Sequence, residues 1–521
     1  MRFRDVRDGV LLVEFPDASD DEANLAAIVL ARNLAGSPPR GLRDAIPAAR
    51  TLLVVFDPDE IPRERLAEQV SRSAGGSDAD GAPSRLVRLP VAYGGVAALD
   101  LGELARAAGL SQEELVRRHA EAEYRVAFIG FAPGFAYLTG LPSELHATRL
   151  SSPRPRVSAG AVGIGGPYTG IYPAAMPGGW RLIGRSTAAL FDPAADPPAR
   201  LSPGDRVRFD PVAEKALPSL PPPEPHRSSE HSHSKPVLRV ASPGLLATIQ
   251  GAPRYGLGSS GVPAGGAMDR SSLARANGLV GNASSDPALE IALIGPELEA
   301  LESIDVAIAG ADFSTELDGK PVPAGGVFRV FRGNRLRFRS ARRGARAYLA
   351  VAGGFVEARR PGEPSPRIEA GEELSASAPP SPRPAGGPER AAAGGPLVLR
   401  VLPGPQSDHF APAAVERFFS TSWRVSSVSD RRGVRLEGER LEHTRAPEIA
   451  PEGTVFGSIQ VPGEGFPIVL GPDGPVTGGY PKIATVIASD LPRLGQAAPG
   501  DALRFRAVPL EEALEARREY H

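Results

Sequence analysis

Two short strings that recur in the same order constrain the fold of this chain most. Thr-Gly-Ile-Tyr-Pro at 169–173 recurs as Thr-Gly-Gly-Tyr-Pro at 477–481, and Pro-Gly-Asp-Arg-Val-Arg-Phe at 203–209 recurs as Pro-Gly-Asp-Ala-Leu-Arg-Phe at 499–505. A Gly-Asp pair followed by alternating residues is typical of a turn that leads into a strand. A partial third copy of the second string lies at 333–338. We therefore predict two related β-barrels, one on each side of a Pro/Ser-rich linker.

The rest of the chain predicts a mainly β protein with α+β parts. We predict an N-terminal α/β domain (1–88), a barrel (89–210), a linker (211–236) and a second half with β-barrel domains (237–521), interrupted by a polar insertion at about 359–395. Within the first domain, hydrophobic periodicity predicts the order βαββαβ, with strands at 2–14, 42–46, 51–56 and 85–91 and helices at 20–34 and after Pro62. Further helices are expected at 101–108, 112–121 and 510–520.

Composition excludes several kinds of chemistry. The 521 residues include no cysteine, which excludes thiolate nucleophiles, disulfides and iron–sulfur clusters. The first lysine is Lys215, so the first 214 residues cannot supply a P-loop, Schiff-base or biotinyl lysine. A net charge of −2 without a basic tract gives nucleic-acid binding little support. No apolar stretch reaches the roughly 18 residues of a membrane span, and we expect a cytoplasmic protein.

The candidate site residues in the first half lie mainly in segments rich in glycine and aromatic residues. The segment 130–137 predicts a wall for a flat small molecule through Phe131, Gly134 and Tyr137, and a packed core is the equal alternative. Gly165, Tyr168 and Thr169 belong to a glycine-rich segment that resembles a phosphate-binding loop, although glycine pairs are also common in turns. His119, on a predicted helix, is a candidate proton carrier, and a packed histidine is the alternative.

Candidate site residues in the second half are mainly arginines and carboxylates. Asp269 fits a helix N-cap or a carboxylate that faces a substrate. Arg275 and Asn277 follow on the same helix and would orient an anionic substrate, because arginine binds carboxylates through two hydrogen bonds. Asp430, Arg431 and Arg435 form a second cluster, which an exposed strand would also explain. No metal-ligand set is predicted, since His231 and His233 of the linker lack acidic or cysteine partners.

Ordered blocks of sequence resemble two known families. LPVAYGG (89–95) and the segments 109–142 and 153–185 are similar to allophanate hydrolase subunit 1, a family that includes the B subunit of 5-oxoprolinase and KipI. Segments of the second half are similar to allophanate hydrolase subunit 2, with the C subunit of 5-oxoprolinase and KipA: 261–282, 286–298, 344–355, 429–438, 457–470 and 477–496. The chain therefore resembles a fusion of the two subunits.

This resemblance implies cyclophilin-like β-barrels in both halves and ATP-dependent opening of 5-oxoproline to L-glutamate together with the A subunit of 5-oxoprolinase, a separate chain. ATP with a divalent cation, Mg²⁺ by preference, is the implied cofactor, and a phosphorylated lactam is the implied intermediate. Asp269, Asp430, Arg431, Arg435 and His119 are the catalytic candidates. The matching blocks add binding candidates, which are Tyr172, Gln250, Arg254, Gln460, Thr477 and Tyr480.

Two other functions stay open on the same resemblance. One is a carboxyltransferase module related to urea carboxylase. Its biotin would have to arrive on another chain, because Met1, Met176 and Met268 each lack an adjacent lysine. The other is a non-catalytic KipI/KipA-like protein that inhibits a sensor kinase. A homo-oligomer also stays open.

Overall fold

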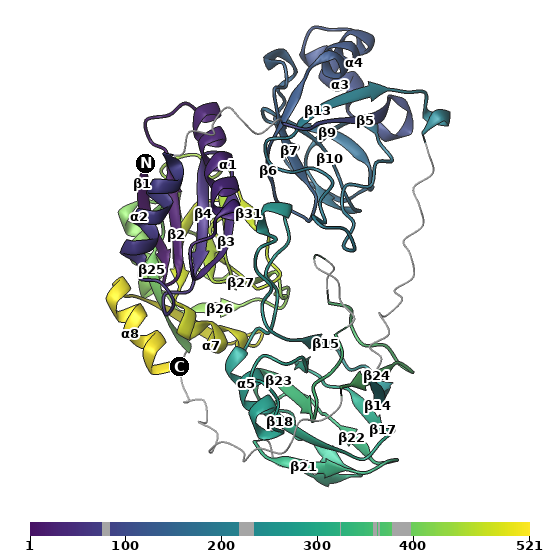
Figure 1. Cartoon of the computed structure of the whole chain (residues 1–521), viewed down its shortest axis with the longest axis vertical. Coiled ribbons are helices and arrows are strands. Elements are labelled where there is room, and N and C mark those ends of the chain that lie inside the picture. The colour runs from purple at the N-terminus through teal and green to yellow at the C-terminus, as the bar shows by residue number, and fades with distance from the viewer. Residues whose placement is uncertain are drawn as a thin grey trace.

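A computed structural model describes residues 1–75, 84–217, 234–322, 325–357, 362, 365–377 and 397–520. These residues form an N-terminal α/β domain, two closed β-barrels and a domain of two open sheets. The N-terminal domain lies against the second barrel, the first barrel lies at one end of the molecule, and the two-sheet domain lies at the other (Figure 1). The fold is mainly β with a barrel in each half, as the sequence predicts.

The N-terminal domain has the order ββαββα. Its elements are β1 (Arg2–Arg7), β2 (Val10–Glu14), α1 (Asp20–Gly36), β3 (Leu42–Pro47), β4 (Thr51–Phe56) and α2 (Arg63–Ala74). The four strands form one sheet in the order β1-β2-β4-β3. A capping box formed by Ser19 and Glu22 opens α1.

The predicted order βαββαβ differs from this domain at both ends. The single strand predicted for 2–14 is a hairpin, because Gly9 takes a left-handed conformation (φ +79°) that reverses the chain. The strand predicted at 85–91 is β5 (Leu86–Tyr93), which pairs in parallel with β13 (Arg206–Pro211) and so belongs to the first barrel.

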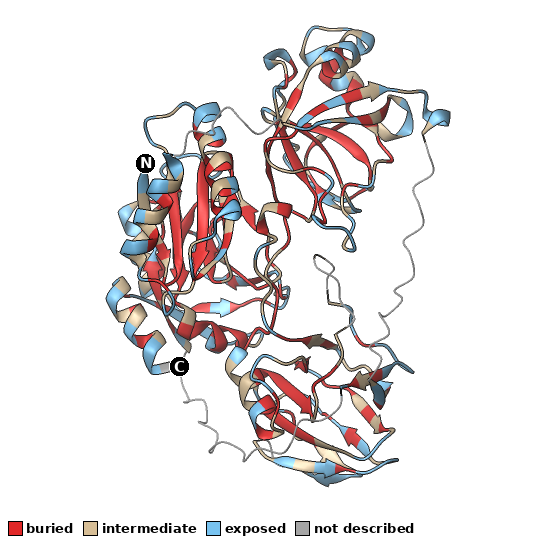
Figure 2. Ribbon diagram, viewed as in Figure 1, coloured by how far each residue is buried: buried red, intermediate tan, exposed pale blue. Residues whose placement is uncertain are grey.

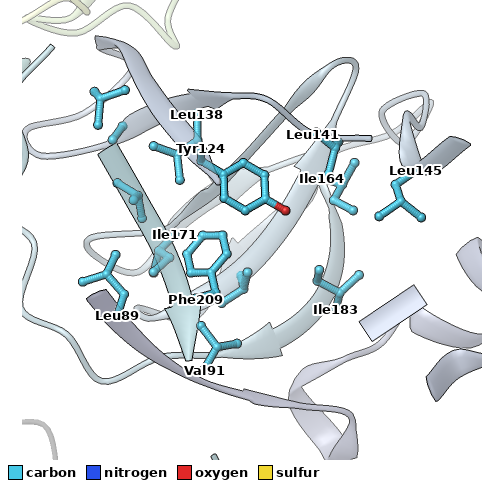
Figure 3. Packing of buried hydrophobic residues seen from close by; sticks show 14 of the residues in the cluster. Leu89, Val91, Tyr124, Leu138, Leu141, Leu145, Ile164, Ile171, Ile183 and Phe209 are labelled. Atoms are coloured by element: carbon cyan, nitrogen blue, oxygen red, sulfur yellow. The ribbon is translucent and has the colours of Figure 1, made fainter. Parts of the chain in front are cut away.

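The first barrel closes in the order β10-β7-β6-β13-β5-β12-β9. Its further elements are α3 (Leu101–Ala107), α4 (Gln112–Glu121), β6 (Tyr124–Ile129), β7 (Ala136–Thr139), β8 (Arg154–Val157), β9 (Ala161–Gly165), β10 (Tyr168–Ile171), β11 (Met176–Gly178) and β12 (Arg181–Arg185). Inward-facing aliphatic side chains surround Tyr124 and Phe209 in its core (Figure 3).

The second barrel closes in the order β25-β32-β29-β30-β27-β26-β33. Its elements are β25 (Leu397–Pro403), α6 (Pro412–Ser420), β26 (Trp423–Val425), β27 (Gly433–Glu437), β28 (Glu452–Gly453), β29 (Ser458–Gln460), β30 (Ile468–Leu470), β31 (Thr477–Gly478), β32 (Lys482–Val486), α7 (Leu491–Gly495), β33 (Ala502–Ala507) and α8 (Leu510–Tyr520). In both barrels the first and last strands pair in parallel and the other strands follow in the same order, so the two barrels have one topology.

Only one of the two recurring strings occupies equivalent places in the barrels. The string at 203–209 leads into β13 and the string at 499–505 leads into β33, and these strands correspond. The string at 169–173 begins inside β10, whereas the string at 477–481 ends just before β32, which corresponds to β12. The partial copy at 333–338 contains β22 (Arg335–Arg337), which lies in an open sheet.

The two-sheet domain packs a six-stranded sheet, β20-β19-β22-β17-β14-β24, on a five-stranded sheet, β15-β16-β23-β18-β21. Its elements besides β22 are β14 (Lys235–Ser242), β15 (Leu246–Gln250), α5 (Arg270–Leu279), β16 (Ala288–Ala292), β17 (Glu297–Ala300), β18 (Ile304–Asp312), β19 (Glu316–Leu317), β20 (Lys320–Pro321), β21 (Val327–Val330), β23 (Arg343–Val351) and β24 (Glu373–Ala376). Figure 2 shows buried residues along strands of both sheets, and residues of both sheets share one hydrophobic core.

Strand β24 lies inside the predicted polar insertion at 359–395, where Leu374 and Ala376 alternate with more exposed residues and pack into the core. The rest of both predicted polar segments falls largely on 218–233 and 378–396, outside the described residues. Among the helices that the structure describes, none combines the length and hydropathy needed to cross a membrane.

Candidate functional site

The loop between β15 and α5, residues 251–269, joins the two halves of the chain; we call it the junction loop. It runs through the middle of the molecule, teal in Figure 1. Its backbone forms hydrogen bonds of 3.0–3.1 Å to three other parts of the fold: Gly256 N to Asp44, Gly134 N to Ser260 O and Gly265 N to Pro472 O. The N-terminal domain and both barrels therefore meet around this loop.

The segment 130–137, which is predicted as a site in the first barrel and which we call the aromatic loop, faces the second half of the chain. Gly130 lies so close to Thr477 that a Cβ on this glycine would collide with the threonine side chain. Gly134 has a φ of +74°, and a Cβ there would lie 2.8 Å from the carbonyl oxygen of Leu190. Phe131, also at positive φ, is 38% exposed at this contact. Thr477, the first residue of the recurring string at 477–481, therefore contributes a contact between the two halves.

Tyrosines from both halves gather beside this contact. The ring of Tyr137 lies 5.5 Å from that of Tyr168, and Tyr480 of the second barrel interacts electrostatically with Tyr137. Burial raises the pKa of all three phenols above their usual value. They are therefore neutral at physiological pH, each able to donate one hydrogen bond and to accept others.

Arg149 is the cation of this group, and sequence reasoning missed it. Its charge acts on Tyr137, Tyr168 and Tyr480 and opposes the rise in their pKa. The residue is exposed, and within the described part of the chain its side chain has neither a hydrogen bond nor an ion pair. Several arginines stand near it in the sequence, so no spacing distinguishes it. An unpaired guanidinium beside neutral phenols is suited to bind a carboxylate.

The second barrel supports this surface through buried polar groups. Gln460 is buried, and its Nε2 donates to the carbonyl oxygen of Tyr480 at 3.4 Å. Lys482 is fully buried, with Nζ 2.7 Å from Glu452. Glu452 lies in β28, and Lys482 begins β32 just after Tyr480 in the chain. This ion pair therefore joins the two strands next to Tyr480 in the sequence. Gln460 and Tyr480 were predicted as site residues, whereas the lysine pair was not.

Arg431 is a predicted catalytic residue that the structure surrounds with partners. Its guanidinium donates to Glu290 at 2.7 Å, to Asp473 at 2.8 Å and to the carbonyl oxygen of Gly266 at 2.7 Å, and it lies 3.3 Å from Gln250. Burial opposes its charge, but the two carboxylates raise its pKa further above the usual value. The network attaches the second barrel to the two-sheet domain and leaves little capacity for a ligand.

Asp269 caps helix α5, which was one of the two roles predicted for it. Its carboxylate accepts from Ser271 Oγ, from Ser272 N and Oγ, and from Gln496 Nε2. Four donors saturate this carboxylate, and only 3% of the residue is exposed. It is thus placed to hold the start of α5 against α7.

The other predicted residues of the second half are dispersed. Asp430 is exposed and closes a turn by accepting from the backbone N–H groups of Arg432 and Gly433. Arg435 lies exposed on β27, away from the tyrosines in sequence and strand order. Asn277 donates to Asp286 O and Arg254 pairs with Glu357, so both contact their own domain. Arg275 Nε is buried without a hydrogen-bond partner among the described residues.

His119 lies in the core of the first barrel with both ring nitrogens bonded. The hydroxyl of Thr169 donates to Gly163 O, so it accepts from His119 Nε2 at 2.9 Å. Nδ1 therefore accepts from the hydroxyl of Tyr93 at 2.8 Å. Burial lowers the pKa of His119 to about 3. The histidine is neutral and fully buried, which fits the packed alternative better than a proton carrier.

The glycine-rich segment predicted to hold phosphate is a β-hairpin. Gly165 pairs with Tyr168, and Thr169 pairs with Ile164, between β9 and β10. A Cβ on Gly165 would collide with the indole of Trp180, so this glycine makes room for a buried side chain. Tyr172, also buried, packs against the same indole. The backbone N–H groups of this segment are committed to the sheet and do not fit a phosphate cradle. Among the described residues, no group of three potential metal ligands occurs either.

Comparison with known proteins assigns each half separately. A family profile described as "Carboxyltransferase domain, subdomain C and D" matches residues 1–201, and one described as "Carboxyltransferase domain, subdomain A and B" matches residues 260–507. The first half is 45% identical to the B subunit of 5-oxoprolinase from Escherichia coli O157:H7 over 186 residues, which are 36% of this chain and 84% of that protein. The second half is 36% identical to the C subunit of 5-oxoprolinase from Haemophilus influenzae over 286 residues, 52% of this chain and 91% of that protein.

A solved structure and a larger enzyme complete the comparison. The crystal structure of a protein called TTHA0988 superposes with a TM-score of 0.84 at 38% identity and covers 95% of this chain and 99% of that one. A putative urea carboxylase of Emericella nidulans is 32% identical over 311 residues, 54% of this chain but only 25% of that protein. The arrangement of all four parts is therefore shared with a known structure. A segment similar to 54% of this chain also occurs within the longer putative urea carboxylase.

Proposed function

Since the chain belongs to the family of 5-oxoprolinase B and C subunits, as a fusion of the two types, we propose that it acts as the combined B–C component of an ATP-dependent 5-oxoprolinase. The observation that carries the proposal is the meeting of Tyr137, Tyr168 and Tyr480 from the two halves beside the unpaired Arg149. The separate A subunit would complete the enzyme.

The reaction needs ATP because a five-membered lactam is an unstrained amide and a poor electrophile. Transfer of the γ-phosphoryl group to the amide oxygen breaks the terminal P–O bond of ATP and makes the ring carbon electrophilic. Attack by a first water molecule on this carbon cleaves the C–N bond and leaves an acyl phosphate of glutamate, which a second water molecule hydrolyses to glutamate and inorganic phosphate. Overall, 5-oxoproline, ATP and two water molecules give glutamate, ADP and inorganic phosphate.

The residues at the junction fit the substrate better than the nucleotide. Arg149 would bind the carboxylate of 5-oxoproline, and the neutral phenols would hydrogen-bond to the lactam C=O and N–H. The flat ring would lie against aromatic walls such as Tyr137. The hairpin at 163–170 does not fit a phosphate, so we place ATP and its divalent cation in the complete enzyme with the A subunit.

The test mixes the purified chain with the A subunit, ATP and 5-oxoproline and measures glutamate. The proposal predicts glutamate only when all four are present, with ADP formed in equal amount. Binding of 5-oxoproline without turnover in any mixture would contradict it and favour a KipI/KipA-like binding protein.

A carboxyltransferase is the second candidate, favoured by the match to the carboxyltransferase-domain profiles and to the putative urea carboxylase. This reaction needs a carboxybiotin donor on another chain. Adding a biotinylated carrier protein with bicarbonate, ATP and a biotin carboxylase to the same assay separates the two functions. Carboxylation of urea or a related amide that depends on the carrier would support this candidate over the first.

A further inference from the structure

A small cavity of about 60 Å³ lies where the N-terminal domain, the junction loop and the second barrel meet. A single water needs only about 10–15 Å³ of such space, so the cavity has room for a group of several heavy atoms. Most of its wall is apolar side chain and backbone, from Ile46, Val55, the loop residues 262–265 and the segment 470–476. Its ionisable groups are Arg7, Asp44, Tyr255 and Arg270.

The two arginines at this cavity lack carboxylate partners. Arg7, at the end of β1, donates from Nη1 to the carbonyl oxygen of Phe456 at 2.7 Å, and its Nε is buried without an acceptor. No ion pair joins Arg7 or Arg270 to any carboxylate that the structure describes. Burial lowers the pKa of Arg7; Asp8 and Tyr255 oppose this effect, and the charge of Arg270 adds to it. A buried donor without a partner is costly, and an anion beside it would satisfy Arg7 Nε.

The nearby carboxylates form no ion pair with either arginine of the cavity. Asp44 lines the cavity, but its Oδ2 accepts from the N–H groups of Gly256 and Gly258 and its Oδ1 from that of Ala45. Asp8 follows Arg7 in the chain and its charge acts to raise the pKa of Arg7, but its Oδ1 accepts from Ala488 N at 2.9 Å and its Oδ2 is buried without a hydrogen-bond partner. Neither carboxylate comes within ion-pair distance of Arg7. Thus the positive charge at the cavity is not neutralised by direct contact.

Tyr255 responds to this positive charge. Burial would raise the pKa of its phenol, but Arg270 and Arg7 overcome that effect, and the pKa lies below the usual value. A phenol so polarised donates a strong hydrogen bond to an anion. The cavity therefore presents two guanidinium groups and one acidic hydroxyl to the same small space.

We infer that this cavity binds a small oxyanion, a carboxylate or phosphate group, through Arg7 Nε, the Arg270 guanidinium and the Tyr255 hydroxyl. Because residues from the N-terminal domain and the junction loop would hold the anion together, its binding would also stabilise the contact between the two halves. The inference does not depend on the proposed enzymatic activity, since it concerns direct binding by this chain alone.

The test is calorimetric titration of the full chain, without ATP or the A subunit, with sodium phosphate, sodium acetate and sodium 5-oxoproline. Sodium chloride at matched ionic strength gives the baseline. We expect saturable binding of at least one oxyanion, weakened about tenfold or more in Arg270→Gln and in Arg7→Gln, because each loses a charge-assisted hydrogen bond. Arg332→Gln, an exposed arginine in the two-sheet domain, is the matched control and should bind as the wild type does.

The pattern of ligands identifies the source of the anion. Binding of phosphate alone indicates a phosphate site, and binding of acetate or 5-oxoproline indicates a carboxylate site. The inference is overturned if no oxyanion binds beyond the chloride baseline, or if Arg270→Gln binds with the wild-type affinity. Arg270 is exposed, so this variant keeps the test decisive even where Arg7→Gln fails to fold.

Discussion

At the scale of residues, His119 is best understood through its counterpart in the other barrel. The His119 ring stacks on Phe209 with centroids 5.0 Å apart, and Phe418 stacks on Phe505 with centroids 4.6 Å apart. Phe209 and Phe505 end the recurring strings that lead into β13 and β33. His119 therefore fills a packing position that the second barrel gives to phenylalanine.

A second pair of contacts supports this equivalence. The hydroxyl of Tyr124 donates to His119 O at 2.6 Å, and the indole N–H of Trp423 donates to Phe418 O at 3.0 Å. In both barrels, the aromatic residue five positions after the stacked ring therefore donates a hydrogen bond to the last turn of the preceding helix, α4 or α6, and holds that helix end against the barrel. Sequence alone could not distinguish a packed from a reactive histidine, because Tyr93 and Phe209, which pack against it, come from strands far along the chain.

Replacement His119→Phe tests this role. Folded His119 stays neutral down to about pH 3, whereas in the unfolded chain it takes a proton near pH 6.5. Stability is therefore lost as pH falls through this window, at about 1.4 kcal/mol per pH unit. Between pH 7 and pH 5 the wild type should lose about 2 kcal/mol from this group. The variant should lack this loss, at a cost of about 1–2 kcal/mol at pH 7 because Tyr93 loses its acceptor.

Urea unfolding at both pH values measures the difference, with His146→Gln, at an exposed position, as the control. Glutamate formation by His119→Phe should match that of the wild type. A variant that is folded but inactive would return His119 to the catalytic candidates.

For Arg149 we predict the opposite of His119, namely a loss of substrate binding without a loss of stability. Its side chain has no partner in the described structure, so Arg149→Gln should leave stability within about 0.5 kcal/mol of the wild type. Loss of a charge-assisted contact to the substrate carboxylate should raise KM for 5-oxoproline by about tenfold or more. Steady-state kinetics with ATP and the A subunit at saturating concentrations provide the measurement, and an unchanged KM would remove Arg149 from the site.

At the scale of elements, the sequence predicts most helices and strands but not how they are shared between domains. The helix at 20–34 and the strand at 51–56 depend on local residue patterns, and both are confirmed. The turn at Gly9 and the transfer of β5 to the barrel depend on pairing with residues far along the chain. The candidate site shows the same limit. Local motifs predict Tyr137, Tyr168 and Tyr480 as site residues, but they do not predict that these tyrosines from two halves of the chain lie together.

Gly130 shows how closely the elements approach at the junction. Its φ is not left-handed, so alanine is excluded there only by Thr477. Gly130→Ala should destabilise the chain by about 1–3 kcal/mol through overpacking. Thr477→Gly removes the side chain that collides, so the double variant should recover part of this loss, and a double-mutant cycle by urea unfolding measures the coupling.

Gly278→Ala is the matched control for Gly130→Ala, because a Cβ at Gly278 on α5 meets no atom within 4 Å. Additive effects of Gly130→Ala and Thr477→Gly would contradict the direct contact between β31 and the aromatic loop.

At the scale of the whole molecule, the two halves form one unit independently of the linker between them. Contacts near both ends of β4 in the N-terminal domain join the first half of the chain to the second half. Arg517 of α8 bonds to Asp57 at 2.9 Å, and Ala49 N donates to Pro451 O at 3.0 Å. Together with the junction loop, these contacts explain how relatives of the two halves can exist as separate B and C subunits.

The site that we propose takes side chains from both halves, so the most direct measurement divides the chain. Residues 1–217 and 234–521, co-expressed as separate chains, should purify as one complex. With the A subunit, ATP and 5-oxoproline, neither half alone should form glutamate, and the two together should restore the rate of the intact chain. Glutamate formation at the full rate by one half with the A subunit would contradict a shared site.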